Sequence, residues 1–348
     1  MHKIIKSISA LQDSLICQLR EISFYIVKLK ELGYTNKSAM AQSIEALSLF
    51  LVNTSFNQTK YLNLVAKLYS LKQSVKEKYK KCCEEQQLPL ETIGTTFEIT
   101  PQTTINQLIE YAEKNSINKQ KATDKTKQKL YELISMFAKL ASISVVKIKS
   151  YEADFDEYDF EILRFFALTN AYSIRNEKIK RRIMEFSHLA LNLREKFIEI
   201  LNSKYGEKQN AQISTSELKG KAILVSGDDL NELDDVLQAV EKSETSISVY
   251  TNGPLILAHF YPYFINNKNL KGHLKDDDIK YLFSTFKGAV LITKHFLQKI
   301  DNLYNGTIFS NKTISFSKVI DIIDNDYSPL INSALKLEGF SSDKETEK

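Results

Sequence analysis

One stretch limits the fold of this chain more than any other: an unbroken apolar run closed by a serine and a glycine, residues 222–227. An uninterrupted run of this length that ends in glycine predicts a buried parallel strand. Asp228 and Asp229 then suit the N-cap and first turn of a helix, whose apolar face recurs at helical spacing as far as Val240. A buried strand that leads straight into an amphipathic helix predicts the opening unit of an α/β layer.

Further strands of the same kind follow. The expected ranges are Ser246–Tyr250, Ala289–Thr293 and Thr307–Phe309. In such mostly parallel sheets, ligands bind at the carboxyl ends of the strands. The segments to search for function are therefore three strand ends, Ser226–Asp229, Tyr250–Pro254 and Thr293–Phe296.

The residues before this layer have helical periodicity instead. Apolar side chains recur every three or four positions from Ile4 to Leu29, and again from Leu130 to Val145, as in amphipathic helices of bundles. The expected fold class is α + α/β, with two N-terminal helical bundles followed by one Rossmann-like parallel α/β domain. The expected parts are a first bundle at 1–102, a second bundle at 103–206, a linker at 207–218, the α/β domain at 219–340 and a disordered tail at 341–348.

Composition narrows the class of protein. The formal net charge of +4 over 348 residues leaves no strong electrostatic footprint for nucleic acid. Three cysteines make no disulfide framework, and no apolar run approaches the roughly 18 residues that span a bilayer. We expect a soluble intracellular protein of the cytoplasm, with the matrix of a mitochondrion or related organelle as the alternative because the first residues are basic.

Several short patterns along the α/β layer resemble one known family. They are Ala222–Gly227 with Asp229-Leu230, then Val249–Thr251, Gly253, Ala258-His259 and Tyr261-Pro262, then Gly288-Ala289, Leu291 and Thr293, and finally Ile308-Phe309 and Asp326–Ile331. In this order they resemble the first α/β domain of the hybrid-cluster protein (prismane) family, which is related to the nickel carbon monoxide dehydrogenases. The resemblance implies hydroxylamine or nitric oxide reductase chemistry at an iron–sulfur–oxygen cluster.

The cluster-binding positions implied by this resemblance are altered. The family uses a histidine, a glutamate and a cysteine after its first three strands, and this sequence has Asp228, Pro254 and Phe296 there. Proline and phenylalanine offer no donor atom to iron. The family's other ligands, three cysteines and a glutamate, belong to a further α/β domain that we do not expect within 348 residues. We therefore expect no cofactor.

Other candidate sites have ordinary structural explanations. Asp228, His259 and His295 suit non-haem iron or zinc by residue type, but helix capping and core packing explain all three residues and are the favoured interpretation. The turn at 226–229 has one glycine where a dinucleotide loop needs three, and its two carboxylates repel phosphate. One Glu185-x-x-His188 motif is too little for a di-iron centre.

Most of the remaining reactive or charged segments are expected to lie at the protein surface. Cys82 and Cys83 lie among lysines and glutamates, so we expect exposed, unspecialised thiols, whereas Cys17 is expected inside the first bundle. The basic stretches Lys76–Lys81 and Asn118–Lys129 lack interleaved aromatic residues, which favours solvated helix or loop surface.

From these departures we expect a catalytically inactive relative, not an enzyme, that acts as a structural or regulatory subunit of a protein assembly. One alternative is a split reductase whose remaining cluster ligands come from a partner, and another is a module that binds a small ligand or a single metal ion. If the family's second α/β domain is missing, an apolar face is left uncovered and should bind a protein partner or a second copy of the chain. Its expected residues are Leu255, Ile256, Leu257, Phe260 and Phe296.

Overall fold

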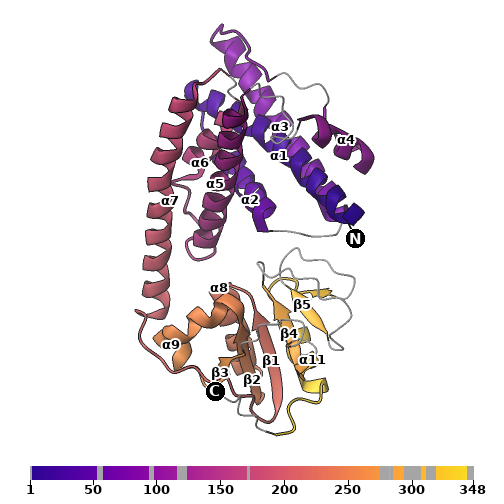
Figure 1. Cartoon of the computed structure of the whole chain (residues 1–348), viewed down its shortest axis with the longest axis vertical. Helices are drawn as coiled ribbons and strands as arrows, with labels where there is room; N and C mark the ends of the chain where they lie inside the picture. Colours follow the sequence, from indigo (N-terminus) through magenta and orange to yellow (C-terminus); the bar gives the residue numbers. More distant parts are fainter. Residues whose placement is uncertain are drawn as a thin grey trace. The chain divides into compact units, whose positions relative to one another are not determined.

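The computed structural model describes residues 2–52, 58–93, 98–115, 124–170, 173–274, 282, 285–293, 307–310 and 319–342. The described residues up to Ile198 form one compact unit, and those from Glu199 onward form a second. The expected fold class is confirmed: helices occupy the first unit and a parallel α/β layer occupies the second (Figure 1). The five-part division of the chain, including the two separate bundles, stays a prediction.

The helical unit is built around one long helix, α1, whose residues from Leu11 to Leu29 are almost continuously buried. Arg20 of α1 donates through Nη2 to the carbonyl oxygen of Thr169 at 2.6 Å and through Nε to the Thr169 hydroxyl at 3.1 Å. Segments almost 150 residues apart in the sequence therefore share one core. The helical elements are α1 (His2–Glu31), α2 (Lys37–Val52), α3 (Gln58–Glu85), α4 (Ile105–Asn115), α5 (Lys125–Lys149), α6 (Asp159–Ala167), η1 (Leu168–Asn170) and α7 (Asn176–Tyr205). Residues Glu199–Tyr205 of α7 belong to the second unit.

The α/β unit is a six-stranded sheet in the order β3-β2-β1-β4-β5-β6, with every neighbouring pair parallel. Its strands are β1 (Lys221–Ser226), β2 (Ile247–Asn252), β3 (Leu270–His273), β4 (Ala289–Ile292), β5 (Ile308–Ser310) and β6 (Val319–Asp321). Its helices are α8 (Leu230–Lys242), η2 (Gly253–Phe260), α9 (Pro262–Ile265) and α11 (Ser328–Lys336). Strands β3 and β6 were not expected, because both are short and neither has a run of apolar residues.

The central strands are covered on both faces, which explains their uninterrupted apolar sequence. Leu224, Tyr250 and Val290 belong to one core with Phe286 and Phe340, and the alternate residues of β1 and β4 on the opposite face are also fully buried. A short antiparallel bridge between Gly220 and Phe340 brings the end of the described chain back to the start of β1. Among the described residues, every helix is too short or too polar to cross a membrane.

Candidate functional site at the carboxyl ends of the strands

The sheet order places a switch point between β1 and β4. The chain builds β2 and β3 on one side of β1, then crosses to build β4, β5 and β6 on the other. At such a point the loops that leave neighbouring strands diverge, which opens the crevice where α/β sheets bind ligands. The turn 227–229 after β1 and Thr293 after β4 flank this crevice.

Thr293 holds the turn after β1 in place. Its backbone N–H donates to the carbonyl oxygen of Ser226 at 2.9 Å, and its hydroxyl accepts from the backbone N–H of Asp228 at 3.0 Å. Gly227 has a φ of +143°, and a Cβ at that position would lie 1.9 Å from Thr293 Oγ1. The residue must be glycine because of both its conformation and this close approach.

A second set of hydrogen bonds ties β1 to β2 and β3. The Ser226 hydroxyl donates to Asn252 Oδ1 at 2.9 Å, and Asn252 Nδ2 donates to the carbonyl oxygen of Leu274 at 2.8 Å. The Asn252 side chain therefore joins the ends of three adjacent strands. The backbone N–H of Leu255 also donates to the carbonyl oxygen of Gly227 at 2.9 Å, which fixes the start of η2 beneath the β1 turn.

Two buried histidines meet at one hydroxyl beside these strand ends. Thr251 Oγ1 lies 2.8 Å from His259 Nε2 and 2.9 Å from His273 Nδ1. Burial, with a smaller contribution from the neighbouring His273, lowers the pKa of His259 to about 4. Burial also lowers the pKa of His273. Because protonation is disfavoured at both rings, the pair serves at neutral pH as uncharged hydrogen-bonding groups.

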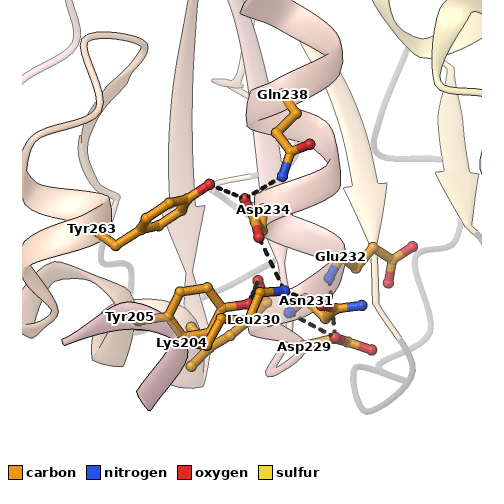
Figure 2. A network of polar contacts seen from close by, with 9 residues as sticks. All are labelled: Lys204, Tyr205, Asp229, Leu230, Asn231, Glu232, Asp234, Gln238 and Tyr263. Atoms are coloured by element: carbon orange, nitrogen blue, oxygen red, sulfur yellow. Dashed lines mark hydrogen bonds and ion pairs between the residues drawn. The ribbon is translucent and has the colours of Figure 1, made fainter. Parts of the chain in front are cut away.

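Helix α8 starts directly from the β1 turn, as its sequence predicts. Asp229 is the N-cap, and its Oδ1 accepts the backbone N–H groups of Asn231 and Glu232, each at 3.1 Å. One turn later the buried Asp234 accepts from Tyr263 Oη at 2.7 Å and faces Lys204 Nζ at 3.2 Å, an arrangement shown in Figure 2.

The same network attaches the end of α7 to the α/β unit. Lys204 Nζ also donates to Asn231 Oδ1 at 2.7 Å, and Gln238 Nε2 donates to Asp234 Oδ1 at 2.9 Å (Figure 2). The ring of Tyr205 packs against Phe264 with the ring centroids 4.6 Å apart. The final turn of α7 thereby fixes both α8 and α9 behind the crevice.

The structure describes two of the three residues proposed for a metal site. Asp228 is half-buried beside Thr293, whereas His259 contributes to the Thr251 network. His273, which sequence analysis missed together with strand β3, is the residue that joins His259. His295 lies outside the described residues, so the three-residue site stays a prediction. Within the described ranges no group of three or more His, Cys, Asp or Glu side chains could hold a metal ion.

The strand-end positions also test the fit of an iron–sulfur cluster. Pro254 opens η2 as an exposed residue without a donor atom, and Phe296 lies outside the described residues. The only cysteines in the 348-residue sequence are at positions 17, 82 and 83, in the helical unit. The donor set that the described strand ends present therefore does not fit such a cluster.

The predicted apolar face is only partly exposed. Ile256 and Leu257 are 37% and 45% exposed, and Phe260 is half-buried. The expectation that Leu255 belongs to this face is wrong, because its side chain is fully buried beneath η2. Tyr263 and Ile265 of α9 are also exposed. We call the exposed side chains of these two helices, Ile256, Leu257, Tyr263 and Ile265, the η2–α9 patch.

The candidate residues of the helical unit have structural roles. Cys17 is buried as expected, and burial raises the pKa of its thiol to about 11. The prediction that Cys82 and Cys83 are exposed is wrong, because both face the core of the unit from the last turns of α3. Glu185 and His188 are both exposed, and Glu185 pairs with Arg182 at 2.7 Å.

One further cleft lies elsewhere in the α/β unit. Its volume is about 590 Å³, and it lies between the second half of α8 and the start of α11. Its lining includes Lys242 and Ser243, which end α8 just before β2 begins. The cleft is therefore near the amino ends of the strands, opposite the edge where parallel sheets bind ligands.

Sequence comparison with known proteins identifies the family of this chain. A model of the Prismane/CO dehydrogenase family matches residues 5–347. The chain belongs to this family. It is 26% identical over 339 residues to a hydroxylamine reductase of Acidiphilium cryptum (strain JF-5), an alignment that covers 95% of this chain and 60% of the relative. It is 25% identical over 342 residues to a hydroxylamine reductase of Acidithiobacillus ferrooxidans, with 96% and 60% covered.

The family corrects one prediction outright. We expected a protein that is not an enzyme, but both relatives are named as reductases, and the family match extends over nearly the whole chain. The resemblance noted in the strand-end motifs is confirmed. The chain spans 60% of the length of the curated relatives it matches, so the activity of a complete Prismane-family protein comes to this chain only as a proposal.

Proposed function

We propose that this chain is the helical and first α/β portion of an oxidoreductase of the hydroxylamine reductase type. The observation that carries the proposal is the switch point of the sheet. The turn at 227–229, Asn252 and Thr293 are braced there by hydrogen bonds, beside the positions Asp228, Pro254 and Phe296 where the family resemblance places cluster ligands. A rigid set of strand ends is what a reaction centre needs from its scaffold.

The chain is proposed to act as a structural subunit or segment of the working enzyme. Reducing hydroxylamine to ammonia and water breaks the N–O bond and consumes two electrons and two protons. Asp228 and the neutral His259–His273 pair can bind and orient a small polar molecule or exchange a proton, but they cannot supply electrons. The electron-carrying group must therefore be held largely by residues outside the described ranges, in the rest of a longer polypeptide or in a partner chain.

The η2–α9 patch is the proposed surface for that remaining part. Ile256 and Leu257 are exposed side chains of η2, the helix that follows directly from the carboxyl end of β2. Exposed apolar side chains next to an incomplete site are well placed to pack against the residues that complete it. A regulatory role would use the same contact.

Reconstitution tests the proposal. The chain should stimulate hydroxylamine reduction, with a reduced viologen dye as the electron donor, only when combined anaerobically with the iron-containing polypeptide with which it is purified. The variant Ile256→Glu should lose this stimulation and the association together. The matched variant Ile323→Glu changes an exposed isoleucine far along the chain and should keep both. Stimulation unaffected by Ile256→Glu would exclude the η2–α9 patch, and no reductase activity in any combination would refute the proposed function.

A further inference from the structure

Two helices of the first unit begin next to each other. Asp124 caps α5 by accepting the backbone N–H of Thr126 at 2.8 Å, and its other oxygen accepts from Asn176 Nδ2, in the first turn of α7, at 2.5 Å. The starts of α5 and α7 are therefore neighbours, although 52 residues separate the two bonded side chains in the sequence.

Both helix starts carry exposed basic side chains. We call them the α5–α7 basic surface, and its residues are Lys125 and Lys129 of α5 with Arg175, Lys178, Lys180 and Arg181 at the start of α7. Among the residues that the structure describes, none of these six side chains forms an ion pair. Glu177 is an exposed carboxylate within the same segment.

These cationic side chains do not stabilise the helices that carry them. The amino end of a helix has a partial positive charge, so cations in its first turn, such as Lys125 and Lys178, are unfavourable there, whereas cations near the carboxyl end are favourable. The surface therefore combines two sources of positive potential, the side chains and the helix ends, and the carboxylates of Asp124 and Glu177 offset only part of it. Such a field attracts a negatively charged partner.

Apolar side chains continue the same exposed faces toward the carboxyl ends. On α7, Met184 is 70% exposed and Leu191 is 50% exposed, while Phe186 and Leu193 are buried on the opposite face. Lys180 is one helical turn before Met184, so the charged and apolar parts share one face of α7. Helix α5 repeats this order, since its basic start is followed by three exposed apolar residues, Leu133, Met136 and Leu140.

The spacing of the apolar residues indicates the kind of partner. Met184, Leu191 and Ile198 are seven residues apart and all are exposed, which gives a narrow seam of the kind that packs against another helix. Proteins that bind single-stranded nucleic acid stack its bases on aromatic side chains, and no aromatic side chain lies among the basic residues at the start of α7. Membrane-surface helices instead present a broad apolar face rich in Trp, Phe and Leu.

We propose that the α5–α7 basic surface and the adjacent seam bind an acidic, amphipathic helix of a partner protein. Carboxylates of the partner face the basic side chains, and its apolar residues cover Met184 and Leu191. This inference does not depend on the reductase chemistry, because it concerns the helical unit alone.

The test uses the full chain and a fluorescent synthetic peptide of about 20 residues, with Glu-rich heptads and Leu at the seam positions. Binding followed by fluorescence anisotropy should weaken at least about tenfold in Lys180→Glu/Arg181→Glu, as expected for loss of complementary charge. The matched variant Lys80→Glu/Lys81→Glu reverses two adjacent exposed lysines on α3 and should bind normally. Met184→Ser should weaken binding without changing its salt dependence.

Thermal unfolding separates binding from folding. Lys180 and Arg181 lie in the second turn of α7, beyond the main reach of the helix dipole, and Arg181 is one turn from both Glu177 and Glu185. Reversing the two cations adds like-charge neighbours, so the melting temperature should shift by no more than about 4 °C. A larger fall would mean that the cations support the fold, which would overturn the proposal. Failure of the peptide to bind would also overturn it. Duplex DNA and phosphatidylserine vesicles are the competing ligands. The proposal is also overturned if either of them binds more tightly than the peptide, and if that binding is weakened by Lys180→Glu/Arg181→Glu but unchanged by Met184→Ser.

Discussion

Replacing Gly227 by alanine tests whether the turn after β1 is as tightly constrained as its geometry indicates. A φ of +143° is adopted almost only by glycine, and forcing another residue into it costs about 1–3 kcal/mol. The new Cβ would lie 1.9 Å from Thr293 Oγ1, so that hydroxyl must move and lose its bond to the Asp228 N–H, at about 1 kcal/mol more. The expected loss of stability is about 2–4 kcal/mol.

Gly220→Ala is the matched control, because it has a φ of +125° in the same unit but no atom within 4 Å of the added Cβ. It should show the backbone cost alone. In the double variant Gly227→Ala/Thr293→Ala the clash with the hydroxyl is absent, so its effect should be smaller than the sum of the two single effects.

Amide hydrogen exchange of β1, followed by mass spectrometry, measures these changes within the α/β unit. The expected loss of protection in Gly227→Ala is about 30- to 900-fold, the equivalent of the free energies above. If Gly227→Ala and Gly220→Ala agree within about 0.5 kcal/mol, the contact with Thr293 does not constrain the turn and the reasoning fails.

Three further predictions follow from buried groups. NMR titration should place the pKa of His259 near 4 in the folded chain and near 6.5 in urea. Because the folded pKa is the lower one, about 3 kcal/mol of stability is fully present above pH 6.5 and is lost as the pH falls toward 4. Titration of the folded chain at an ordinary pKa would contradict the burial of His259. Asp234→Ala should destabilise the α/β unit by about 2–4 kcal/mol, since it leaves Lys204 and Tyr263 without their shared carboxylate. The control Glu207→Ala, at an exposed carboxylate just after α7, should change stability little by the same exchange assay. Because all three thiols are buried, none should react with Ellman's reagent within minutes in buffer, and all three should react in urea. Fast labelling of Cys82 or Cys83 in buffer would contradict the packing of α3.

The parts of the α/β unit that could be predicted are those with strong local signals. The run at 222–227 is buried on both faces, so its apolar character needs no knowledge of its neighbours, and Asp229 caps α8 as its position predicts. Strand β3 contains Lys271 and Gly272, and it exists because its backbone pairs with β2. Such pairing depends on residues distant in the sequence.

The candidate site shows the same division. The residues at each strand end could be named from the sequence, but the bond between Asp228 and Thr293 and the meeting of His259 with His273 depend on the crossover of the chain. The burial of Cys83 was mistaken because its charged neighbours describe one face of α3 and the cysteine lies on the other. Sequence patterns indicate which side of a helix or strand is apolar, but which of these sides contact each other depends on the fold.

Iron analysis of an anaerobically purified assembly tests the central proposal most directly. The chain should be isolated from its native source, and iron, acid-labile sulfide and hydroxylamine-dependent dye oxidation should be measured on both the assembly and the chain after separation. The account predicts iron and activity in the assembly, with little iron left on residues 1–348 alone. Stoichiometric iron on the separated chain would contradict the ligand argument, and an assembly with neither iron nor activity would contradict the reductase proposal.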